Sequence, residues 1–166
     1  MPADRTVRKR SAGLLLYRES HGALEVLLVH PGGPFWARKD DGAWSIPKGE
    51  FEGDEEPLAA ARREFAEETG ATVEGDFTEL RPVRLPSGKI VHAWAVRADF
   101  EPARLRSNTF TMQWPPKSGQ LREFPEVDRA AWFALEQARA TIQPGQRPLL
   151  DQLEALVRPG NAPRAP

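Results

Sequence analysis

Residues 49–71 read GEFEGDEEPLAAARREFAEETGA, in which acidic residues recur at helical spacing behind a glycine turn. Asp54 suits the N-cap of a helix, Pro57 fits the first turn, and Gly70 favours the end of the helix. The stretch therefore predicts a helix over residues 55–69.

The predicted helix has one packing face and one acidic face. The packing face consists of Leu58, Ala61, Arg62 and Phe65. The acidic face consists of Glu64, Glu67 and Glu68. Carboxylates at these spacings repel one another, and the helix dipole disfavours anions near the C-terminal end. A bound cation would relieve both penalties.

The acidic face indicates a divalent-metal site. Hard oxygen ligands suit Mg²⁺ or Mn²⁺, and Mg²⁺ commonly joins one or two carboxylates to substrate phosphates. This combination points to phosphate chemistry. The alternative is an ordinary solvated face that Arg62 and Arg63 neutralise.

The same stretch resembles the Nudix box position by position. That motif reads Gly, five residues, Glu, seven residues, Arg-Glu, an apolar residue, any residue, Glu-Glu, any residue, Gly and an apolar residue. At the last position Ala71 replaces a larger aliphatic residue, which affects packing rather than chemistry. By this resemblance the chain is identified as a member of the Nudix family. The matching residues are Gly49, Glu55, Arg63, Glu64, Phe65, Glu67, Glu68 and Gly70.

Length and composition fit one domain. The chain has 166 residues, and 40% of them are hydrophobic and available for a core. We expect a single domain over residues 1–158 and a flexible Pro/Ala-rich tail over residues 159–166. The net charge of -1 offers no general attraction to nucleic acid or to an anionic membrane, so a small anionic substrate must be held locally.

Cysteine is absent, which excludes disulfides, thiolate metal sites and a cysteine nucleophile. The basic opening over residues 1–10 is followed by an apolar run that is too short for a signal peptide or a membrane span. We therefore expect a soluble, cytoplasmic protein without a membrane partner.

The rest of the chain alternates between strand and helix patterns. Two aliphatic runs, residues 11–17 and 25–30, predict a central β-hairpin with its turn over residues 19–23. Further strands are expected over residues 79–85, 90–99 and 130–133, and further helices over residues 135–141 and 148–157. This order indicates a mixed α/β or α+β domain, and the resemblance implies the Nudix fold, a mixed β-sheet sandwiched between helices.

A Pro-rich stretch over residues 106–125 separates two of the predicted strands. It is too long and too polar for a simple connection, and long loops are often functional. We expect it to be a loop that lies over the site.

The resemblance implies a hydrolase that splits a nucleoside diphosphate linked to another group, with Mg²⁺ or Mn²⁺ activating water and neutralising phosphoryl charge. The expected substrates are nucleoside triphosphates or dinucleoside polyphosphates. Residues 44–49 and Trp132-Phe133 are similar to pieces of diadenosine tetraphosphate hydrolases and of general nucleotide pyrophosphatases of the family, which does not decide between these substrates. The alternative is a catalytically silent Nudix-fold module that binds or senses nucleotides. Isomerisation of a prenyl diphosphate is disfavoured by the absence of cysteine, and messenger-RNA decapping by the lack of a basic patch.

The resemblance also implies roles for the matching residues. Arg63 is expected to orient a carboxylate, with a structural salt bridge as the alternative. Glu55 is favourable at the start of the helix and is expected to reach Arg63 only indirectly. A homodimer is left open. The implied metal ligands are the Gly49 carbonyl and the carboxylates of Glu64, Glu68 and, directly or through water, Glu67.

The general base is either a glutamate of the box, such as Glu64 or Glu67, or a later carboxylate. Glu126 is the first later candidate and Glu123 the second, because both precede the last predicted strand. The alternative for both is a solvated loop charge. Geometry towards the attacked phosphorus decides among them.

Residues outside the box are candidates for substrate contacts. Lys48, beside the glycine turn, is expected to contact phosphate, with a solvated charge as the alternative. An aromatic and imidazole lining on which a base stacks is the second expectation, with core packing as the alternative for the tryptophans, above all Trp94. The candidates for this lining are His30, Trp36, His92, Trp94 and Trp114.

Overall fold

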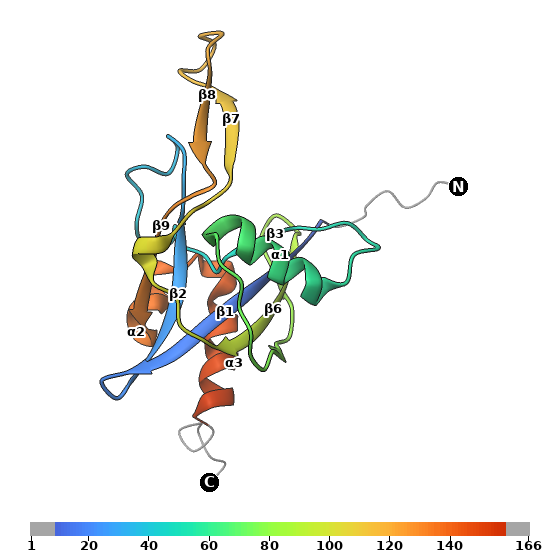
Figure 1. Cartoon of the computed structure of the whole chain (residues 1–166), viewed down its shortest axis with the longest axis vertical. Helices are drawn as coiled ribbons and strands as arrows, with labels where there is room; N and C mark the ends of the chain where they lie inside the picture. The colour runs from blue at the N-terminus through green and yellow to red at the C-terminus, as the bar shows by residue number, and fades with distance from the viewer. Residues whose placement is uncertain (1–8, 159–166) are drawn as a thin grey trace.

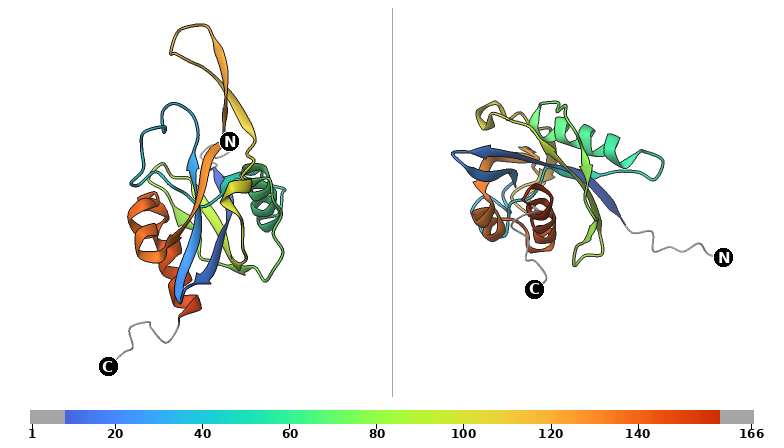
Figure 2. Two further views of the ribbon diagram at one scale, coloured as in Figure 1. Left: turned by 60° about the vertical axis from the view of Figure 1, so that its left-hand side comes forward. Right: turned by 90° about the horizontal axis from the view of Figure 1, so that it is seen from below.

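A mixed β-sheet runs through the middle of the molecule and carries helices on both faces (Figures 1 and 2). The computed structural model describes residues 9–158, so the tail predicted over residues 159–166 lies outside the described part. The strands of the sheet are β1 (Arg10–Ser20), β2 (Ala23–Pro31), β3 (Lys48–Glu50), β4 (Thr78–Glu79), β5 (Val83–Arg84), β6 (Ile90–Arg97) and β9 (Val127–Ala134). The helices are α1 (Pro57–Thr69), α2 (Leu135–Thr141) and α3 (Arg147–Val157), with short 3-10 turns at Pro102–Arg104 and Pro144–Gln146. The predicted mixed sheet between helices is confirmed.

The β1–β2 hairpin forms the centre of the sheet, as predicted, in the strand order β4-β6-β1-β2-β9. Its turn consists of His21 and Gly22, whose φ angles of 53° and 79° are both positive. Two residues of this conformation match the twist of a tight antiparallel hairpin. Pairing therefore continues from Tyr17 to Ser20, and the turn predicted over residues 19–23 is too wide.

Strand β1 also brings the glycine turn of the acidic stretch to the middle of the sheet. It runs parallel to β6 and, along its first residues, antiparallel to β3. Ala12 consequently lies opposite both His92 of β6 and Gly49 of β3. Gly49 therefore lies in a strand that is paired with buried β1, and not in an unpaired loop.

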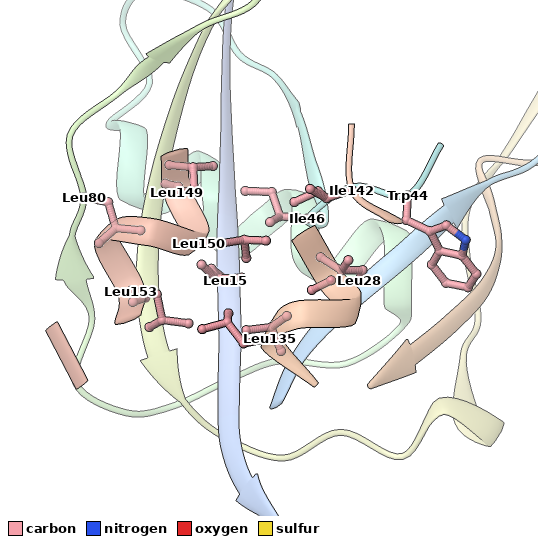
Figure 3. Close-up of a cluster of buried hydrophobic side chains, with 14 of the residues drawn as sticks. Leu15, Leu28, Trp44, Ile46, Leu80, Leu135, Ile142, Leu149, Leu150 and Leu153 are labelled. Atoms are coloured by element: carbon pink, nitrogen blue, oxygen red, sulfur yellow. The ribbon is translucent and has the colours of Figure 1, made fainter. Parts of the chain in front are cut away.

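Alternate residues of β1 enter two separate cores. Leu14 and Leu16 pack with Phe65 on the α1 side of the sheet. Leu15 packs on the opposite side, where Figure 3 shows it among side chains such as Leu135 and Leu150. Because both faces of β1 are buried, a slip of one residue would exchange the two cores, and the register is strongly specified.

Helix α1 begins at Pro57, later than the predicted residue 55. Its N-cap is Glu56, which is extended at φ -65° and ψ 131° and whose side chain makes no capping bond. Proline pushes the preceding residue towards extended backbone, so the helix does not reach back to Asp54. The predicted N-cap at Asp54 is wrong, whereas Gly70 ends the helix in the left-handed conformation, as predicted.

The packing face of α1 differs from the prediction at Arg62. The buried residues of the helix include Ala60, Ala61 and Phe65. Arg62 is exposed instead, and its guanidinium pairs with Glu74 at 3.0 Å. Small alanines therefore allow close approach of the helix to the sheet, and the arginine stays in solvent.

The strand predicted over residues 79–85 is interrupted between β4 and β5, although both pieces pair with β6. Pro82 has no N–H to donate, which favours a break in the ladder. The main chain of Arg81 bonds instead to the side chain of Gln152 on α3, with distances of 2.6 Å and 3.1 Å.

Residues 106–125 contain a second hairpin, so their interpretation as a long loop is wrong, although Asn108 at the base of the hairpin does lie at the candidate site described below. Strands β7 (Thr109–Gln113) and β8 (Leu121–Pro125) form a separate two-stranded sheet that projects from the body of the molecule (Figure 1). Phe110 and Phe124 lie opposite each other, with ring centroids 6.0 Å apart, and Phe110 also lies close to Gly33. Apolar packing at its base thus stabilises the hairpin.

The predicted elements near the C-terminal end are confirmed with small shifts. Helix α2 has the predicted bounds, α3 begins at Arg147, and β9 is longer than predicted. Within residues 9–158, no helix is both long enough and apolar enough to cross a membrane.

Candidate functional site

A cavity of about 430 Å³ opens between β3, α1 and the base of the β7–β8 hairpin. The acidic face of α1 forms one wall, and lysines from β3 and from the turn before β6 form another. Such a cavity combines the charges that a metal and a phosphate need. Its lining residues are Ser11, Lys48, Gly49, Glu50, Glu64, Glu67, Glu68, Lys89, Asn108 and Glu126.

Gly49 is the residue that lets the carboxylate of Glu64 reach the main chain of β3. A Cβ atom at this position would overlap Oε1 and the carboxyl carbon of Glu64. The main chain of the same strand also meets Glu68, whose Oε1 accepts a hydrogen bond of 3.3 Å from the Lys48 N–H. Two carboxylates of α1 therefore lie directly against β3, beside Gly49.

Arg63 donates hydrogen bonds to three glutamates of the acidic stretch, Glu55, Glu64 and Glu67. Its Nε and Nη2 donate to the two oxygens of Glu55 at 2.9 Å and 3.0 Å. Its Nη1 donates to Glu64 at 2.7 Å and to Glu67 at 3.0 Å. The expectation of only indirect contact with Glu55 is therefore wrong, because the two-point geometry suits the planar guanidinium.

The electrostatics of the cavity show an excess of negative charge at α1. Burial raises the pKa of Glu68 to about 8, and the carboxylates of Glu64 and Glu126 add to the effect against the opposing charge of Lys48. Burial also raises the pKa of Glu64, while Arg63 acts in the other direction. Burial and then Lys89 lower the pKa of Lys48. A further cation at α1 would stabilise the ionised glutamates.

The donor set fits a hard divalent cation, because it consists of oxygen atoms only. As the side chains stand, no group of three acidic or histidine residues within residues 9–158 encloses a position for an ion. Arg63 binds one oxygen of Glu64 and one of Glu67, so releasing these bonds is the change that would turn them towards a cation. The residues that would hold it are Gly49, Glu64, Glu67 and Glu68.

Glu126 lines the cavity from the base of the hairpin, next to the C-terminal part of α1. The main chain of Asn108 holds it there: the Asn108 N–H donates to Glu67 O, and the Glu126 N–H donates to Asn108 O, both at 2.8 Å. Glu123, the second candidate for the general base, lies on β8, accepts a bond of 2.8 Å from Thr109 and does not line the cavity. The geometry brings only Glu126 to the carboxylates of α1.

The aromatic candidates for substrate contact lie apart from this cavity. Trp36 follows β2 and packs at the edge of the core on the α2 and α3 side. Trp114 directly follows β7 and packs edge-to-face against Phe35, with ring centroids 5.5 Å apart. His92 lies on β6 and packs against Phe51 at 6.0 Å. Their contact with substrate stays a prediction.

Two further members of the predicted lining are buried. Trp94 is 7% exposed and belongs to the core on the α1 side. His30 is fully buried, with its Nδ1 2.8 Å from Asp128 and its Nε2 2.6 Å from the carbonyl of Lys39. Through these two contacts the ring joins β2 to the start of β9 and to the segment that contains Lys39.

The sequence predictions missed Ser11, Glu50, Lys89 and Asn108, which also line the cavity. Ser11 reaches the cavity because β1 pairs with β3, and Lys89 because it ends the turn that leads into β6. Asn108 does so because the hairpin returns to α1. The alternation of Phe110, Met112 and Trp114 is typical of a strand and could have revealed the hairpin. The pairing of β1 with β3, which brings Ser11 to the cavity, leaves no pattern in the local sequence.

A larger cavity of about 790 Å³ lies between the β4–β5 edge and α3. Its acidic residues, Glu79 and Asp151, come from opposite sides, and it contains none of the residues of the acidic helix face. Size alone does not identify a site for phosphate chemistry. The smaller cavity has the convergent carboxylates and lysines.

Comparison with known proteins matches residues 7–153 to the NUDIX domain. The chain is 30% identical over 154 residues to an RNA pyrophosphohydrolase of Rhodospirillum rubrum, covering 87% of this chain and 89% of that protein. It is 32% identical over 154 residues to an 8-oxo-(d)GTP phosphatase of Mycolicibacterium smegmatis, covering 85% of this chain and 40% of that protein. A crystal structure of a C. elegans Ap4A hydrolase binary complex superposes with a TM-score of 0.60 and 25% identity over 90% of this chain and 97% of that one.

Proposed function

The chain belongs to the Nudix family and is a Nudix hydrolase, and from this premise we propose that it is a metal-dependent enzyme that cleaves a pyrophosphate linkage. Its substrates would be nucleoside diphosphates joined to a further group, as in nucleoside triphosphates or dinucleoside polyphosphates. The observation that carries this proposal is the cavity in which Glu64, Glu67, Glu68 and Glu126 meet beside Gly49.

The residues of α1 and β3 would hold the metal, Mg²⁺ or Mn²⁺. The Gly49 carbonyl and the carboxylates of Glu64 and Glu68 are the direct ligands in this proposal, with Glu67 as a direct or water-mediated one. A divalent cation bound there supplies neutralisation of phosphoryl charge and polarisation of the attacked group. The missing side chain of Gly49 supports this assignment, since it leaves room for a carboxylate against the main chain.

The other charged residues would orient the reactants and move the proton. Glu126 faces the acidic wall from outside the helix, which supports its role as the base that accepts a proton from the attacking water. Arg63 is also held by Glu55 through bonds of 2.9 Å and 3.0 Å, so it would stay beside Glu64 and Glu67 and orient them when they turn to the cation. Lys48, at the opposite wall, would contact a phosphate oxygen. Glu64 and Glu67 remain the alternatives to Glu126 as the base.

The substrate class is supported by what similar proteins are named for. One is named an RNA pyrophosphohydrolase, one an 8-oxo-(d)GTP phosphatase, and one an Ap4A hydrolase. All three names refer to hydrolysis of a phosphate-containing nucleotide or RNA. We expected no nucleic acid as a partner from the net charge of -1, and a 5′-triphosphorylated RNA belongs in the substrate panel as the direct test.

The alternative, a catalytically silent module that binds nucleotides, is not favoured. A silent module would be free to lose the carboxylates of the box, and this chain keeps Glu64, Glu67 and Glu68 in one cavity. Arg63 neutralises only part of this acidic cluster, and the negative charge that remains costs free energy unless a further cation binds. Catalysis is a reason to retain it.

The experiment is a substrate panel with and without MgCl2. Release of phosphate, pyrophosphate and nucleotide would be measured for nucleoside triphosphates, 8-oxo-dGTP, diadenosine polyphosphates and 5′-triphosphorylated RNA. Glu68→Gln is the test variant, and Glu74→Gln, on the exposed surface, is its matched control. We expect magnesium-dependent cleavage of at least one class, lost in Glu68→Gln and retained in the control. A folded protein that binds nucleotide but cleaves none of them would favour the silent module.

A further inference from the structure

Ser11 has a buried hydroxyl group without a hydrogen-bond partner at the wall of the cavity. The residue is 0% exposed, and within residues 9–158 its Oγ finds no donor or acceptor. A buried hydroxyl normally has a partner, because its removal from water is otherwise uncompensated. The exception at a cavity wall points to a ligand that completes the bond.

An ion pair spans the face of the sheet on which Ser11 lies. In the strand pairing Ser11 is opposite Glu50 of β3 and Val91 of β6, so all of these side chains share one face. Lys89 directly precedes β6 and lies two residues before Val91. Its Nζ is 2.9 Å from Oε2 of Glu50. The pair therefore bridges the strands on either side of β1, across the position of Ser11.

Lys48 adds a second ammonium group to the same wall. It is paired with Gly13, two residues along β1 from Ser11, and so lies on the same face. Because Gly13 has no side chain, Lys48 can lie against β1: a Cβ at Gly13 would be 2.6 Å from Lys48 Cβ. The cavity thus presents two ammonium groups near one unpaired hydroxyl, in addition to the carboxylates of α1.

We propose that Ser11, Lys48 and Lys89 form a phosphate subsite that holds one phosphate of the substrate while the carboxylate wall serves the neighbouring phosphate. This proposal rests on the proposed function and names further residues for it. A phosphate oxygen replaces Glu50 as the partner of Lys89, which uncovers the Ser11 hydroxyl as a donor. Glu50 is the competitor that occupies Lys89 in the free protein.

The chemistry of the three groups suits phosphate. A phosphate offers several acceptor oxygens and negative charge, and the wall offers a hydroxyl donor and ammonium groups with rotatable donors. A phosphate oxygen offers Lys89 a charge-assisted bond of the same kind as the one that Glu50 gives it, and the bond from the otherwise unpaired Ser11 hydroxyl is additional. That pair is partly exposed, with side-chain exposures of 26% for Lys89 and 49% for Glu50, so exchange needs no opening of the core.

The test measures binding of methylenediphosphonate, a diphosphate analogue that is not hydrolysed, by calorimetry with MgCl2 and separately with EDTA. Ser11→Ala is expected to weaken binding about tenfold, since it removes a hydrogen bond to a charged ligand. Its thermal midpoint should not fall, because the hydroxyl has no partner in the free protein. A purely structural Ser11 predicts the opposite pattern, a lower midpoint with unchanged binding.

A second pair of variants tests the exchange of partners. Glu50→Gln frees Lys89 and should tighten binding of the analogue, whereas the matched control Glu52→Gln removes an exposed charge outside the cavity and should change it by less than twofold. Lys89→Met should weaken binding, and Lys89→Arg should restore part of it. Ser11→Ala and Lys89→Met that both bind within twofold of the wild type would overturn the subsite.

The binding test of the phosphate subsite can fail or succeed independently of the cleavage test of the proposed function. Glu68→Gln would lose cleavage if the proposed function holds, but it should keep binding of the analogue in EDTA, where only the lysine and serine wall contributes. A protein that cleaves no substrate and still loses analogue binding in Ser11→Ala would retain the subsite and refute the hydrolase.

Discussion

Gly49 is the residue at which the smallest chemical change should have the largest effect on activity. Gly49→Ala places a methyl group where the Glu64 carboxylate now lies, so the carboxylate must turn away from β3. Displacement of a catalytic group by about 1 Å costs on the order of 100-fold in rate, and we expect a loss of that size in kcat. Steady-state kinetics on the substrate found in the panel measure it.

The control for this variant is Gly53→Ala. A Cβ at Gly53 meets no atom within 4 Å, so the added methyl group has room. Activity of Gly53→Ala should match the wild type within about twofold. Equal losses in both variants would mean that the loop tolerates no side chain anywhere and that Glu64 is not the cause.

Glu68 should make the stability of the metal-free protein depend on pH. Its folded-state pKa of about 8 lies above the ordinary value of 4.5, because burial disfavours the charge. The folded protein therefore holds a proton that the unfolded chain has released, and this contribution is fully present below pH 4.5 and is lost as pH rises towards 8. Urea unfolding in EDTA should give a free energy of unfolding that falls between pH 5.5 and 8, by at most about 1.4 kcal/mol per pH unit.

Glu68→Gln removes the titrating group and should flatten this dependence, since glutamine carries no proton that the pH range releases. MgCl2 should also flatten it for the wild type, because a cation stabilises the ionised carboxylate. An identical slope for the wild type and Glu68→Gln in EDTA would show that other groups cause it.

At this scale the sequence predicted the residues whose spacing is local. Glu64, Glu67 and Glu68 follow from helical spacing, and all line one cavity. Ser11 and Lys89 were missed because strand pairing brings them to the cavity from outside the motif. Of the aromatic candidates for substrate contact, Trp36 packs at the edge of the core on the α2 and α3 side and Trp94 belongs to the core on the α1 side.

Helix α1 depends on Gly70 for its ending, which is a property of the element rather than of the site. Gly70 has φ 81°, and a Cβ there would lie 2.9 Å from both Cβ and O of Arg106. Gly70→Ala should therefore lower the free energy of unfolding by about 2 kcal/mol through left-handed backbone and crowding together. Urea unfolding monitored by circular dichroism measures the change.

Gly88→Ala separates the two causes. Gly88 has a similar φ of 93°, but a Cβ there meets nothing within 4 Å. Its replacement should cost about 1 kcal/mol, the backbone contribution alone. If Gly88→Ala costs as much as Gly70→Ala, contact with Arg106 does not contribute.

Helices and strands with a clear periodic pattern of apolar residues were predicted well. Elements that are stabilised by contacts with residues distant in the sequence were not. Helix α2 was predicted at both ends, since its apolar spacing is local. The β7–β8 hairpin was missed because prolines and polar residues dominate its sequence, while its stability comes from contacts such as Phe110 with Phe124 and Gly33. The broken strand near Pro82 depends likewise on Gln152, a residue of a distant helix.

At the scale of the whole molecule, both cores share strand β1, so we propose that residues 1–158 unfold as one domain. Leu14 packs on the α1 side and Leu15 on the α2 and α3 side, and both are fully buried. Leu14→Ala and Leu15→Ala should each cost about 2 to 5 kcal/mol. Both should shift one common transition in urea, observed by tryptophan fluorescence and by circular dichroism.

Two separate transitions, of which each variant shifts only one, would contradict a single domain. The conservative variants Leu14→Ile and Leu15→Ile keep the volume and should cost less, about 1.5 kcal/mol or below. They show whether the loss reflects cavity formation rather than misfolding of the strand.

The mixed sheet and its helices could be predicted from the sequence because the box identifies the family, whereas the projection of the hairpin could not. The hairpin matters for the site, since its base supplies Asn108 and Glu126. The site therefore joins a local motif to long-range pairing, and only the first part is visible in the linear sequence.

The most direct test of a catalytic metal site on α1 is a titration of Mg²⁺ into the metal-free enzyme while cleavage of its substrate is followed, for the wild type and Glu68→Gln. We predict that the wild-type rate rises from background and saturates. The rate of Glu68→Gln should stay at least about 100-fold lower, because a buried ligand to the cation is lost. A Glu68→Gln protein that reaches the wild-type rate at the same Mg²⁺ concentration would contradict the assignment of this helix as the metal site.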